Sequence, residues 1–264
     1  MIEKYDAFIF DLDGTIYKGE NLILNADLTV NKLKELKKNM LFVSNKTTGS
    51  IKDYLVFLKN KGVNISEGEI INSTIVIKNH LLKYYPQKKF FAIAEQNFID
   101  ELSEAGIEYS KNPALIDIVI ITLDRKLNYA KLETAAKALE RGAKFFAANI
   151  DNTCPVESGE VLDAGSTISA LEKRTHKKLE KHFGKPSEFM IDEIKSRLNI
   201  NSKKILLIGD RLETDILMGN LLSVDTALVA TGVTNFPNGN VDIRPTYYLN
   251  SVFDLIKHKK LLNQ

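Results

Sequence analysis

The sequence has a single cysteine and no apolar run long enough to span a membrane. Cys154 stands alone among the 264 residues, so the chain cannot form an internal disulfide, which favours a reducing compartment. A transmembrane helix needs roughly 18 or more consecutive apolar residues, and no segment comes near that length. A strand pattern begins at Tyr5, which leaves no room for a signal peptide. These absences predict a cytoplasmic protein.

An excess of charge of one sign is also missing. The 36 Lys and Arg residues nearly balance the 34 Asp and Glu residues, for a net charge of +2. This balance gives no support for a nucleic acid or a membrane surface as partner. Two phosphate-binding loops are absent as well, because the sequence has no G-x-x-x-x-G-K-S/T segment and no G-x-G-x-x-G segment after its first strand. Their absence weighs against ATP-dependent and dinucleotide-dependent activities.

What the sequence does contain is a regular alternation of short apolar runs with helical patterns. Strands are predicted at residues 5–10, 40–43 and 205–208, and helices at residues 25–37 and 214–222, for example. A further helix is expected after a last strand at residues 247–249. Alternation of this kind predicts an α/β fold with mostly parallel strands.

The middle of the chain has strands and helices of its own. Strand patterns at residues 90–94, 116–123 and 144–148 alternate with further helical patterns, and the style of the first block resumes afterwards. The simplest architecture is a discontinuous core domain with a smaller α/β domain inserted in it. The core would comprise residues 1–78 and 183–264, and the inserted domain residues 79–182.

Four short polar segments lie far apart in the sequence, and three of them directly follow a predicted strand. The carboxyl ends of parallel strands are where loops gather around a ligand in an open α/β sheet. We therefore expect the segments to meet at one site that combines carboxylates, a hydroxyl and a lysine. They are Asp11-Leu12-Asp13-Gly14-Thr15, Ser44-Asn45, Gly184-Lys185-Pro186, and Gly209-Asp210 with Asp215.

Asp11 and Asp13 are two positions apart at the end of a strand, so their carboxylates face the same side. Two adjacent anions repel one another unless a cation lies between them. An acidic turn is the ordinary alternative, because Asp-Gly is a common turn pair. Together with Asp210, the pair offers hard oxygen ligands, and the four histidines show no ligand spacing. This donor set favours magnesium over zinc.

The other candidates are individually ordinary. Asp215 lies in the first turn of a predicted helix, where a carboxylate suits the helix dipole. Ser44 and Asn45 can donate hydrogen bonds to phosphoryl oxygens, but both residue types are also frequent in turns. Lys185, between a glycine and a proline, fits an exposed turn equally well. Only the combination of all four segments favours a function for these residues.

In this combination the sequence resembles the haloacid dehalogenase-like (HAD) phosphatase superfamily. The segment beginning at Asp11 matches the first motif, Ser44 the second, Lys185 the third, and Asp210 with Asp215 the fourth. Relatives often have threonine where this chain has Ser44, and the hydroxyl is retained. The middle of the chain resembles the C2-type cap of the class IIA subgroup, which contains NagD-like nucleotidases and the nitrophenyl, phosphoglycolate and pyridoxal phosphate phosphatases. The resemblance covers nearly the whole chain.

The resemblance implies a Rossmann-like, doubly wound core and Mg²⁺-dependent hydrolysis of phosphate monoesters. Asp11 would attack phosphorus and form an aspartyl-phosphate, and Asp13 would protonate the leaving oxygen and then activate water. An acid at position 13 distinguishes phosphatases from the dehalogenases of the superfamily, whose halide leaves without a proton. Magnesium would be held by Asp11, the Asp13 backbone carbonyl and Asp210, with Asp215, Gly14 and Thr15 in support. The phosphoryl oxygens would be held by Ser44, Asn45 and Lys185.

The resemblance also assigns the choice of substrate to the inserted domain. Asp124, Arg125 and the loop at residues 149–155 are the candidates for facing the leaving group, with Asn149 and Asp151 as substrate-binding residues. The expected partner is a small metabolite, such as a sugar phosphate, a nucleotide, phosphoglycolate or pyridoxal phosphate. A homodimer through the cap is the association that the resemblance suggests.

Two other functions use the same residues. A phosphotransferase would pass the aspartyl-phosphate to another hydroxyl instead of water. A non-catalytic Mg²⁺-binding module of the receiver type would keep the acidic pocket alone, but it needs neither Asp13 nor an inserted domain of this size. We therefore favour the phosphatase.

Overall fold

The computed structural model describes residues 1–156, 159–199, 204–234 and 242–257. The chain divides into two compact units. Unit 1 comprises Met1–Val43, Leu55–Ile70 and Ile194–Gln264, and unit 2 comprises Ser44–Tyr54 and Ile71–Glu193. The boundaries of the core and the inserted domain given above, residues 1–78, 79–182 and 183–264, stay a prediction.

Unit 1 is built on a six-stranded sheet with the strand order β14-β13-β12-β1-β4-β5. β1 pairs in parallel with β12 on one side and with β4 on the other. Every residue of β1 and β12 is buried, as expected for central strands of a sheet that is covered on both faces. The strands are β1 (Ala7–Asp11), β4 (Asn39–Ser44), β5 (Ile70–Asn72), β12 (Ile205–Gly209), β13 (Asp225–Val229) and β14 (Tyr247–Leu249).

The strand order of this sheet reverses between β1 and β12. From β1 the chain passes through α1 (Ala26–Glu35) to β4, which lies on one side of β1. From β12 it passes through the π-helical turn η4 (Leu212–Ile216) and α8 (Leu217–Leu221) to β13, which lies in the opposite direction. The loops after β1 and β12 therefore diverge, and in open α/β sheets ligands bind at such a reversal.

Shorter elements complete unit 1. β2 (Tyr17–Lys18) and β3 (Asn21–Leu22) form a small antiparallel hairpin directly after the β1 loop. The 3₁₀ turns are η1 (Ile2–Lys4), η2 (Glu67–Glu69) and η5 (Val252–Leu255). Two helices, α2 (Ile51–Asn60) and α7 (Glu188–Arg197), carry the chain from one unit to the other.

Unit 2 has a four-stranded parallel sheet with the order β11-β8-β7-β6. Its strands are β6 (Phe90–Ile93), β7 (Ile118–Ile121), β8 (Lys144–Ala147) and β11 (Lys181–His182). Asparagine caps two of its helices, because the side chain of Asn72 accepts a hydrogen bond at the start of α3 (Ser73–Tyr84) and that of Asn128 at the start of α5 (Tyr129–Glu140). Unit 2 also contains α4 (Gln96–Glu104), α6 (Ala164–Thr175) and the antiparallel hairpin of β9 (Thr153–Val156) and β10 (Gly159–Leu162).

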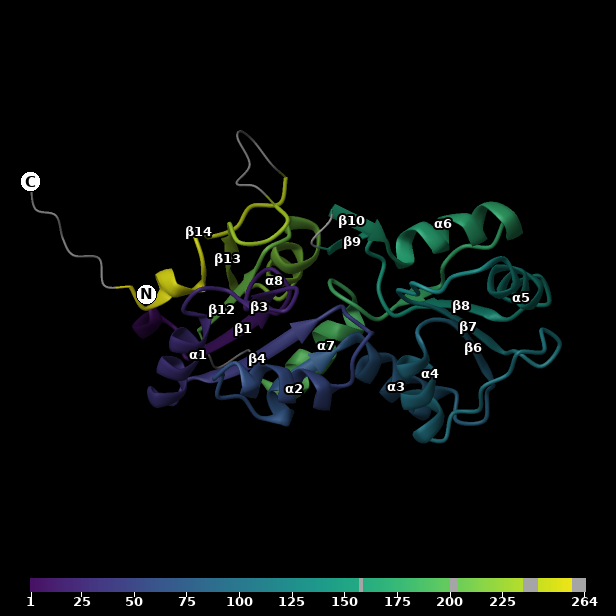
Figure 1. The fold of residues 1–264 in the computed structure, drawn as a ribbon, viewed down its shortest axis with the longest axis horizontal. Coiled ribbons are helices and arrows are strands. Elements are labelled where there is room, and N and C mark those ends of the chain that lie inside the picture. The colour runs from purple at the N-terminus through teal and green to yellow at the C-terminus, as the bar shows by residue number, and fades with distance from the viewer. Residues whose placement is uncertain (157–158, 200–203, 235–241, 258–264) are drawn as a thin grey trace, which may run out of the picture. The chain divides into compact units, whose positions relative to one another are not determined.

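Helices cover both faces of this sheet (Figure 1). Phe91 and Phe145 belong to a core that contains residues of α5 and α6. Side chains alternate along a strand, so Phe146 points to the other face, where the His80 ring of α3 lies 6.4 Å from it. Lys78 of α3 forms an ion pair with Glu101 of α4, which places α4 beside α3 on that face. α4 and α5, the helices that follow β6 and β7, thus lie on opposite faces.

The α/β fold with mostly parallel strands is confirmed. The helix expected at residues 214–222 begins two residues earlier, with the π-helical turn η4, and Asp215 lies in that first turn. The helix expected after β14 is the short 3₁₀ turn η5, and residues 258–264 lie outside the described part of the chain. Within the described residues, the helices are all too short or too polar to cross a bilayer.

Candidate active site

Three buried carboxylates gather at the carboxyl edge of the unit 1 sheet. Asp11 is the last residue of β1, Asp210 directly follows β12, and Asp215 lies in η4. One oxygen of each can be chosen so that all three lie within 4.8 Å of one another. The exposed fractions are 7% for Asp11, 2% for Asp210 and 1% for Asp215. The fold thus brings residues 11 and 210 together at the strand-order reversal, as the strand-end pattern predicted.

Glycines allow the backbone to approach these acids closely. A β-carbon at Gly232 would lie 1.9 Å from Oδ2 of Asp210, and one at Gly14 would lie 2.5 Å from the same atom. Gly14 also has a φ of +91°, in the region that favours glycine. At Gly209, an added β-carbon would lie 2.3 Å from the β-carbon of Asp215. Any side chain at these positions would displace an acid of the cluster.

Backbone amides fix the direction of two of the acids. The amide of Val233 donates a 2.8 Å hydrogen bond to Oδ2 of Asp210, and the amide of Arg211 donates a 3.2 Å bond to Oδ2 of Asp215. The hydroxyl of Thr231 donates to the backbone oxygen of Gly14 at 2.6 Å. Sequence reasoning did not select residues 231–233. Their signal was available, because they follow β13, another strand of the same sheet.

The acidic cluster fits a divalent cation. Carboxylates this close repel one another without a cation, and burial in a poorly polarisable environment strengthens the repulsion. Its three members are all hard oxygen donors, a set that suits Mg²⁺ better than Zn²⁺. Asp13 is not part of this group of three. It is partly buried, and its backbone forms an isolated β-bridge with Tyr17. The role of its backbone carbonyl as a metal ligand stays a prediction.

Thr15 lies in the turn that follows Asp11. Its side chain is fully buried, and its amide donates a 3.2 Å hydrogen bond to the backbone oxygen of Leu12. The amide of Gly14 donates to the backbone oxygen of Tyr17 at 2.6 Å. These backbone bonds close the turn that follows the two acids.

A second polar cluster lies in unit 2 around Asn45. The amide of Lys185 donates a 2.6 Å hydrogen bond to Oδ1 of Asn45. The side-chain amide of Asn45 donates to Asp151 at 3.0 Å, and the side chain of Asn149 donates to the backbone oxygen of Asn45 at 3.3 Å. The structure thus brings together four of the predicted residues, from segments more than a hundred positions apart.

Each member of the Asn45 cluster is positioned by a strand end of unit 2 or by the loop at residues 44–49. Asn149 follows β8, and Lys185 follows β11. Both side chains are buried, with exposed fractions of 2% and 3%. Gly184 is required for this packing, because an added β-carbon would lie 2.7 Å from Oδ1 of Asn45 and 2.8 Å from the backbone oxygen of Ala148.

Ser44 is the last residue of β4. It follows Val43, which lies beside Asp11 in the register of the unit 1 sheet. Its side chain is 3% exposed, and its oxygen accepts a 3.1 Å hydrogen bond from the amide of Lys46.

Asp124 and Arg125 are tied to other residues of unit 2. Asp124 accepts hydrogen bonds from the amide of Lys126 and from the ammonium of Lys131. Arg125 forms two hydrogen bonds with Glu95, and these hold the pKa of Glu95 below its usual range. A role for Asp124 or Arg125 in facing the leaving group stays a prediction.

Comparisons with known proteins agree with this geometry. Residues 8–108 match the family model of haloacid dehalogenase-like hydrolases, and residues 182–255 match a HAD-hydrolase-like model. The sugar-phosphatase AraL of Bacillus subtilis is 32% identical over 251 residues, which cover 95% of this chain and 92% of the relative.

Two solved structures are similar over almost the whole chain. The p-nitrophenyl phosphatase of Archaeoglobus fulgidus has a TM-score of 0.87 and 31% identity, and the match covers 96% of this chain and 98% of the other. The glycerol phosphate phosphatase of Mycobacterium tuberculosis, solved in complex with magnesium, has a TM-score of 0.83 and 25% identity, over 96% of this chain and 77% of the other.

The fold, the acidic strand ends and these relatives define the class of protein, a phosphatase on an α/β scaffold. The chain belongs to the haloacid dehalogenase-like hydrolase superfamily and, within it, to the NagD-like phosphatases. The resemblance read from the four motifs is therefore confirmed.

Proposed function

We propose that the protein is a Mg²⁺-dependent phosphatase that hydrolyses phosphate monoesters of small metabolites through an aspartyl-phosphate on Asp11. The observation that carries the proposal is the buried cluster of Asp11, Asp210 and Asp215 at the strand-order reversal of the unit 1 sheet. A phosphate dianion would be repelled from this cluster unless a cation offset the charge.

In this proposal the cation is held by Asp11, Asp210 and the backbone carbonyl of Asp13, with Asp215 in support. When bound, Mg²⁺ offsets the negative charge of the carboxylates and of the incoming phosphoryl group. Gly14 and Gly232 serve the same end, because their lack of a side chain leaves Asp210 in place.

The chemical steps use two carboxylates. A carboxylate oxygen of Asp11 attacks phosphorus, and the bond between phosphorus and the ester oxygen breaks. Asp13 gives its proton to the leaving oxygen, which an alkoxide leaving group requires. Asp13 then takes a proton from the water that attacks the aspartyl-phosphate, and inorganic phosphate leaves with Asp11 regenerated.

The residues around Asn45 have a different role in this proposal. Ser44, Asn45 and Lys185 hold phosphoryl oxygens, for which a hydroxyl, an amide and an ammonium are suitable donors. Asn149 and Asp151 contact the rest of the substrate. The hydrogen bonds within the Asn45 cluster support this assignment, because they hold the backbone and side chains in one arrangement before a ligand arrives.

The names of the relatives restrict the substrate to a class. They act on sugar phosphates, glycerol phosphate and nitrophenyl phosphate by their names. We accordingly propose a small, soluble phosphate monoester, of the sugar phosphate, nucleotide, phosphoglycolate or pyridoxal phosphate type. A homodimer through the inserted domain belongs to the same proposal, and light scattering on the purified protein measures it.

Release of inorganic phosphate from nitrophenyl phosphate tests the reaction and its metal. We expect turnover with Mg²⁺, none after EDTA, and recovery when Mg²⁺ is added in excess. Full activity in the chelator would remove the metal from the mechanism. The same assay across sugar phosphates, nucleoside monophosphates, phosphoglycolate and pyridoxal phosphate identifies the preferred ester.

A phosphotransferase would use the same intermediate. Added acceptor alcohols decide between the two, since a transferase forms a new phosphate ester in place of inorganic phosphate. The chain belongs to a group of phosphatases, which argues against a non-catalytic receiver-like module.

A further inference from the structure

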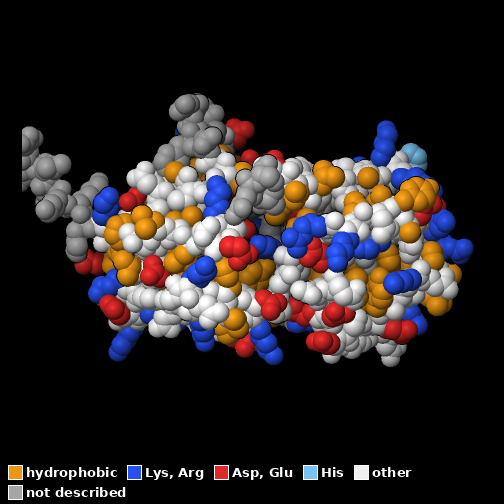
Figure 2. Space-filling model, in the orientation of Figure 1, with side chains coloured by type: hydrophobic (Ala, Val, Ile, Leu, Met, Phe, Trp, Pro, Cys, Tyr) orange, Lys and Arg blue, Asp and Glu red, His pale blue; other side chains and the backbone are white. Residues whose placement is uncertain are grey.

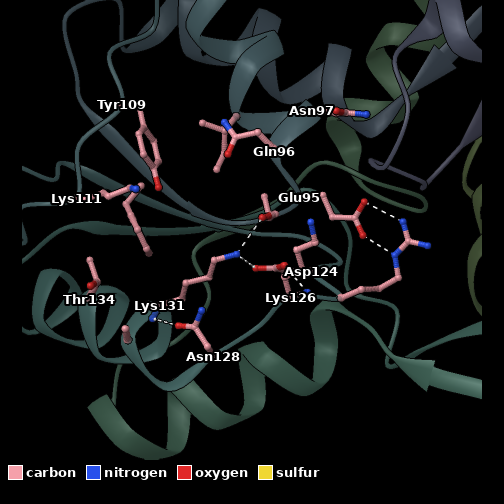
Figure 3. A pocket seen from close by; sticks show the side chains of 15 residues that line it. Glu95, Gln96, Asn97, Tyr109, Lys111, Asp124, Lys126, Asn128, Lys131 and Thr134 are labelled. Carbon is pink, nitrogen blue, oxygen red and sulfur yellow. Dashed lines mark hydrogen bonds and ion pairs between the residues drawn. The ribbon is translucent and has the colours of Figure 1, made fainter.

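A cavity of about 890 Å³ opens in unit 2 where β6 and β7 end. Its walls come from the loops that follow these strands, from the first turns of α4 and α5, and from Tyr109 and Lys111 (Figure 3). Sites for small molecules usually occupy about 300–1,000 Å³. None of the lining residues belongs to the acidic cluster or to the Asn45 cluster, so the steps of phosphoryl transfer proposed above do not use them.

The cavity lies at a second reversal of strand order. After β6 and α4, the chain returns along the outer edge of β6, where Tyr109 forms a parallel bridge with Phe90. The amide of Phe90 donates to Glu108 at 2.9 Å, and the amide of Ser110 donates back to Phe90 at 2.8 Å. After β7 and α5, the chain turns the other way, to β8. In open α/β sheets, such a reversal at the carboxyl ends of strands is where ligands bind.

An ammonium group is fixed in the wall of this cavity. The side chain of Asp124 is only 1% exposed, and it accepts hydrogen bonds from the ammonium of Lys131 and, at 2.9 Å, from the amide of Lys126. Lys131 also donates to the backbone oxygen of Ala94 at 3.4 Å. An ammonium has three donors, so one N–H of Lys131 remains for a ligand, and its side chain is 28% exposed.

The other polar groups favour an anion as that ligand. Four cations and two anions line the cavity, and the anions Glu95 and Asp124 are already paired with Arg125 and Lys131. In the described part of the chain, Lys111 and Lys126 are exposed and form no ion pair. Figure 2 shows Lys and Arg side chains on the visible face of the molecule, with Asp and Glu side chains among them.

Tyr109 adds a neutral donor. Its hydroxyl points into the cavity (Figure 3), while its ring stacks on Phe91 with the centroids 5.9 Å apart. Burial, together with the charge of Asp124, raises the pKa of the phenol, so it stays protonated at neutral pH. The cavity therefore offers an ammonium and a phenol above an aromatic wall.

We propose that this cavity is a binding site for a small organic anion, with the phosphate or carboxylate group of a metabolite on the ammonium of Lys131. The ligand contacts none of the residues that carry out phosphoryl transfer. The site is thus a second ligand site of the protein, and its occupancy does not depend on turnover.

Isothermal titration of the full chain in metal-free buffer tests the site. Phosphonoacetate, which cannot be hydrolysed, is the phosphate-type probe, and tricarballylate is the carboxylate-type probe. We expect at least one of them to bind with a Kd below about 1 mM. Comparing the two probes shows which anionic group the site prefers.

Variants place the binding in this cavity. Ala130→Phe fills the cavity from an exposed position of α5 and leaves the Lys131–Asp124 pair intact, and we expect binding to weaken at least about tenfold. Lys131→Met should also weaken binding, because it removes the ammonium group. Lys137→Met removes an exposed cation from the same helix and should leave binding unchanged. Lys185→Met, which changes a residue proposed to hold phosphoryl oxygens, should also leave binding in this cavity unchanged.

Three results would overturn the proposal. One is the absence of binding by both probes at 1 mM. Another is binding that survives Ala130→Phe unchanged. The third is binding that Lys185→Met abolishes, since the probe would then occupy the phosphoryl site. If Lys131→Met fails to fold because Asp124 is left buried and unpaired, Ala130→Phe alone decides.

Discussion

The two sheets of this protein follow the same topological rule and carry opposite chemistry at their carboxyl ends. In unit 1, the order reverses between β1 and β12, and the strand ends there supply Asp11 and Asp210. In unit 2, the order reverses between β6 and β7, and the cavity there has an excess of positive charge. The fold therefore explains where ligands bind, while the loop residues decide what kind of ligand is accepted.

The two edges also differ in how their groups are held. The acids of unit 1 depend on glycines that let the backbone pass within contact distance, and on amides of residues 211 and 233. The polar groups of unit 2 depend on side-chain hydrogen bonds, above all those of Asn45. We expect the first arrangement to be intolerant of any added atom, and the second to be sensitive to loss of a donor or an acceptor.

The largest effect is expected for Asp11→Asn. The amide is nearly the same size but is not a nucleophile, so turnover should fall by roughly 10⁴-fold or more. Phosphate release under single-turnover conditions measures it. Asp192→Asn, at an exposed helix position, is the control and should keep full activity. Retained turnover in Asp11→Asn would move the nucleophile to another residue.

The next largest effect is expected for Gly232→Ala. The new methyl group would lie 1.9 Å from Oδ2 of Asp210, so the carboxylate must move and the affinity for Mg²⁺ should fall about 10–100-fold. The Mg²⁺ dependence of the rate measures this change. Gly68→Ala is the matched control, because a β-carbon there has no neighbour within 4 Å. Equal Mg²⁺ dependence in both variants would show that Asp210 does not need its present position.

A smaller effect, on substrate binding, is expected for Lys185→Met. Loss of a charged hydrogen bond costs about 1.5–3 kcal/mol, so KM should rise roughly 10–100-fold, whereas Mg²⁺ affinity should stay the same. Lys173→Met removes an exposed lysine of unit 2 and serves as control. Unchanged kinetics in Lys185→Met would transfer the phosphate-holding role to another lysine, such as Lys46.

The smallest effect is expected for His80 of α3, and it concerns the free energy of unfolding. Burial first, then the charges of Lys181 and Lys83, lower the pKa of His80 to about 4, from 6.5. Between these values the unfolded chain binds a proton that the folded chain does not, so His80 lowers stability progressively as the pH falls from 6.5 to 4.

Replacement of His80 by phenylalanine should remove part of this acid sensitivity. The new phenyl ring would take the place of the imidazole among its aromatic neighbours Phe183 and Phe189, whose ring centroids lie 4.9 and 4.8 Å from that of the imidazole. Urea unfolding at pH 7, 5.5 and 4.5 measures how the free energy of unfolding depends on pH. His176→Asn, which removes an exposed histidine, should follow the wild type. If the free energy of unfolding falls with pH as steeply in His80→Phe as in the wild type, other groups cause the acid sensitivity.

The sequence contained most of the fold because its central strands are strongly apolar. Runs such as Ile205–Gly209 and Phe90–Ile93 are buried on both faces, so their signal is continuous and easily recognised. Short elements were missed for the opposite reason. β5 and β11 have three and two residues, and their pairing depends on distant segments. The π-helical form of η4 was likewise hidden, since its residues are ordinary for an α-helix.

For the site, the sequence by itself determined which residues could carry the chemistry and which ion suits them. Asp11 and Asp210 follow predicted strands, and the side-chain types of these two residues and of Lys185 favour a hard cation and a phosphoryl group. Only the tertiary structure decided that Asp215 and not Asp13 joins the buried group of three, that residues 231–233 hold Asp210, and that unit 2 has a cavity of its own. The physical reason is that a strand's period and a residue's charge are local properties, whereas the order of strands, and hence which loops meet, depends on contacts across the whole chain.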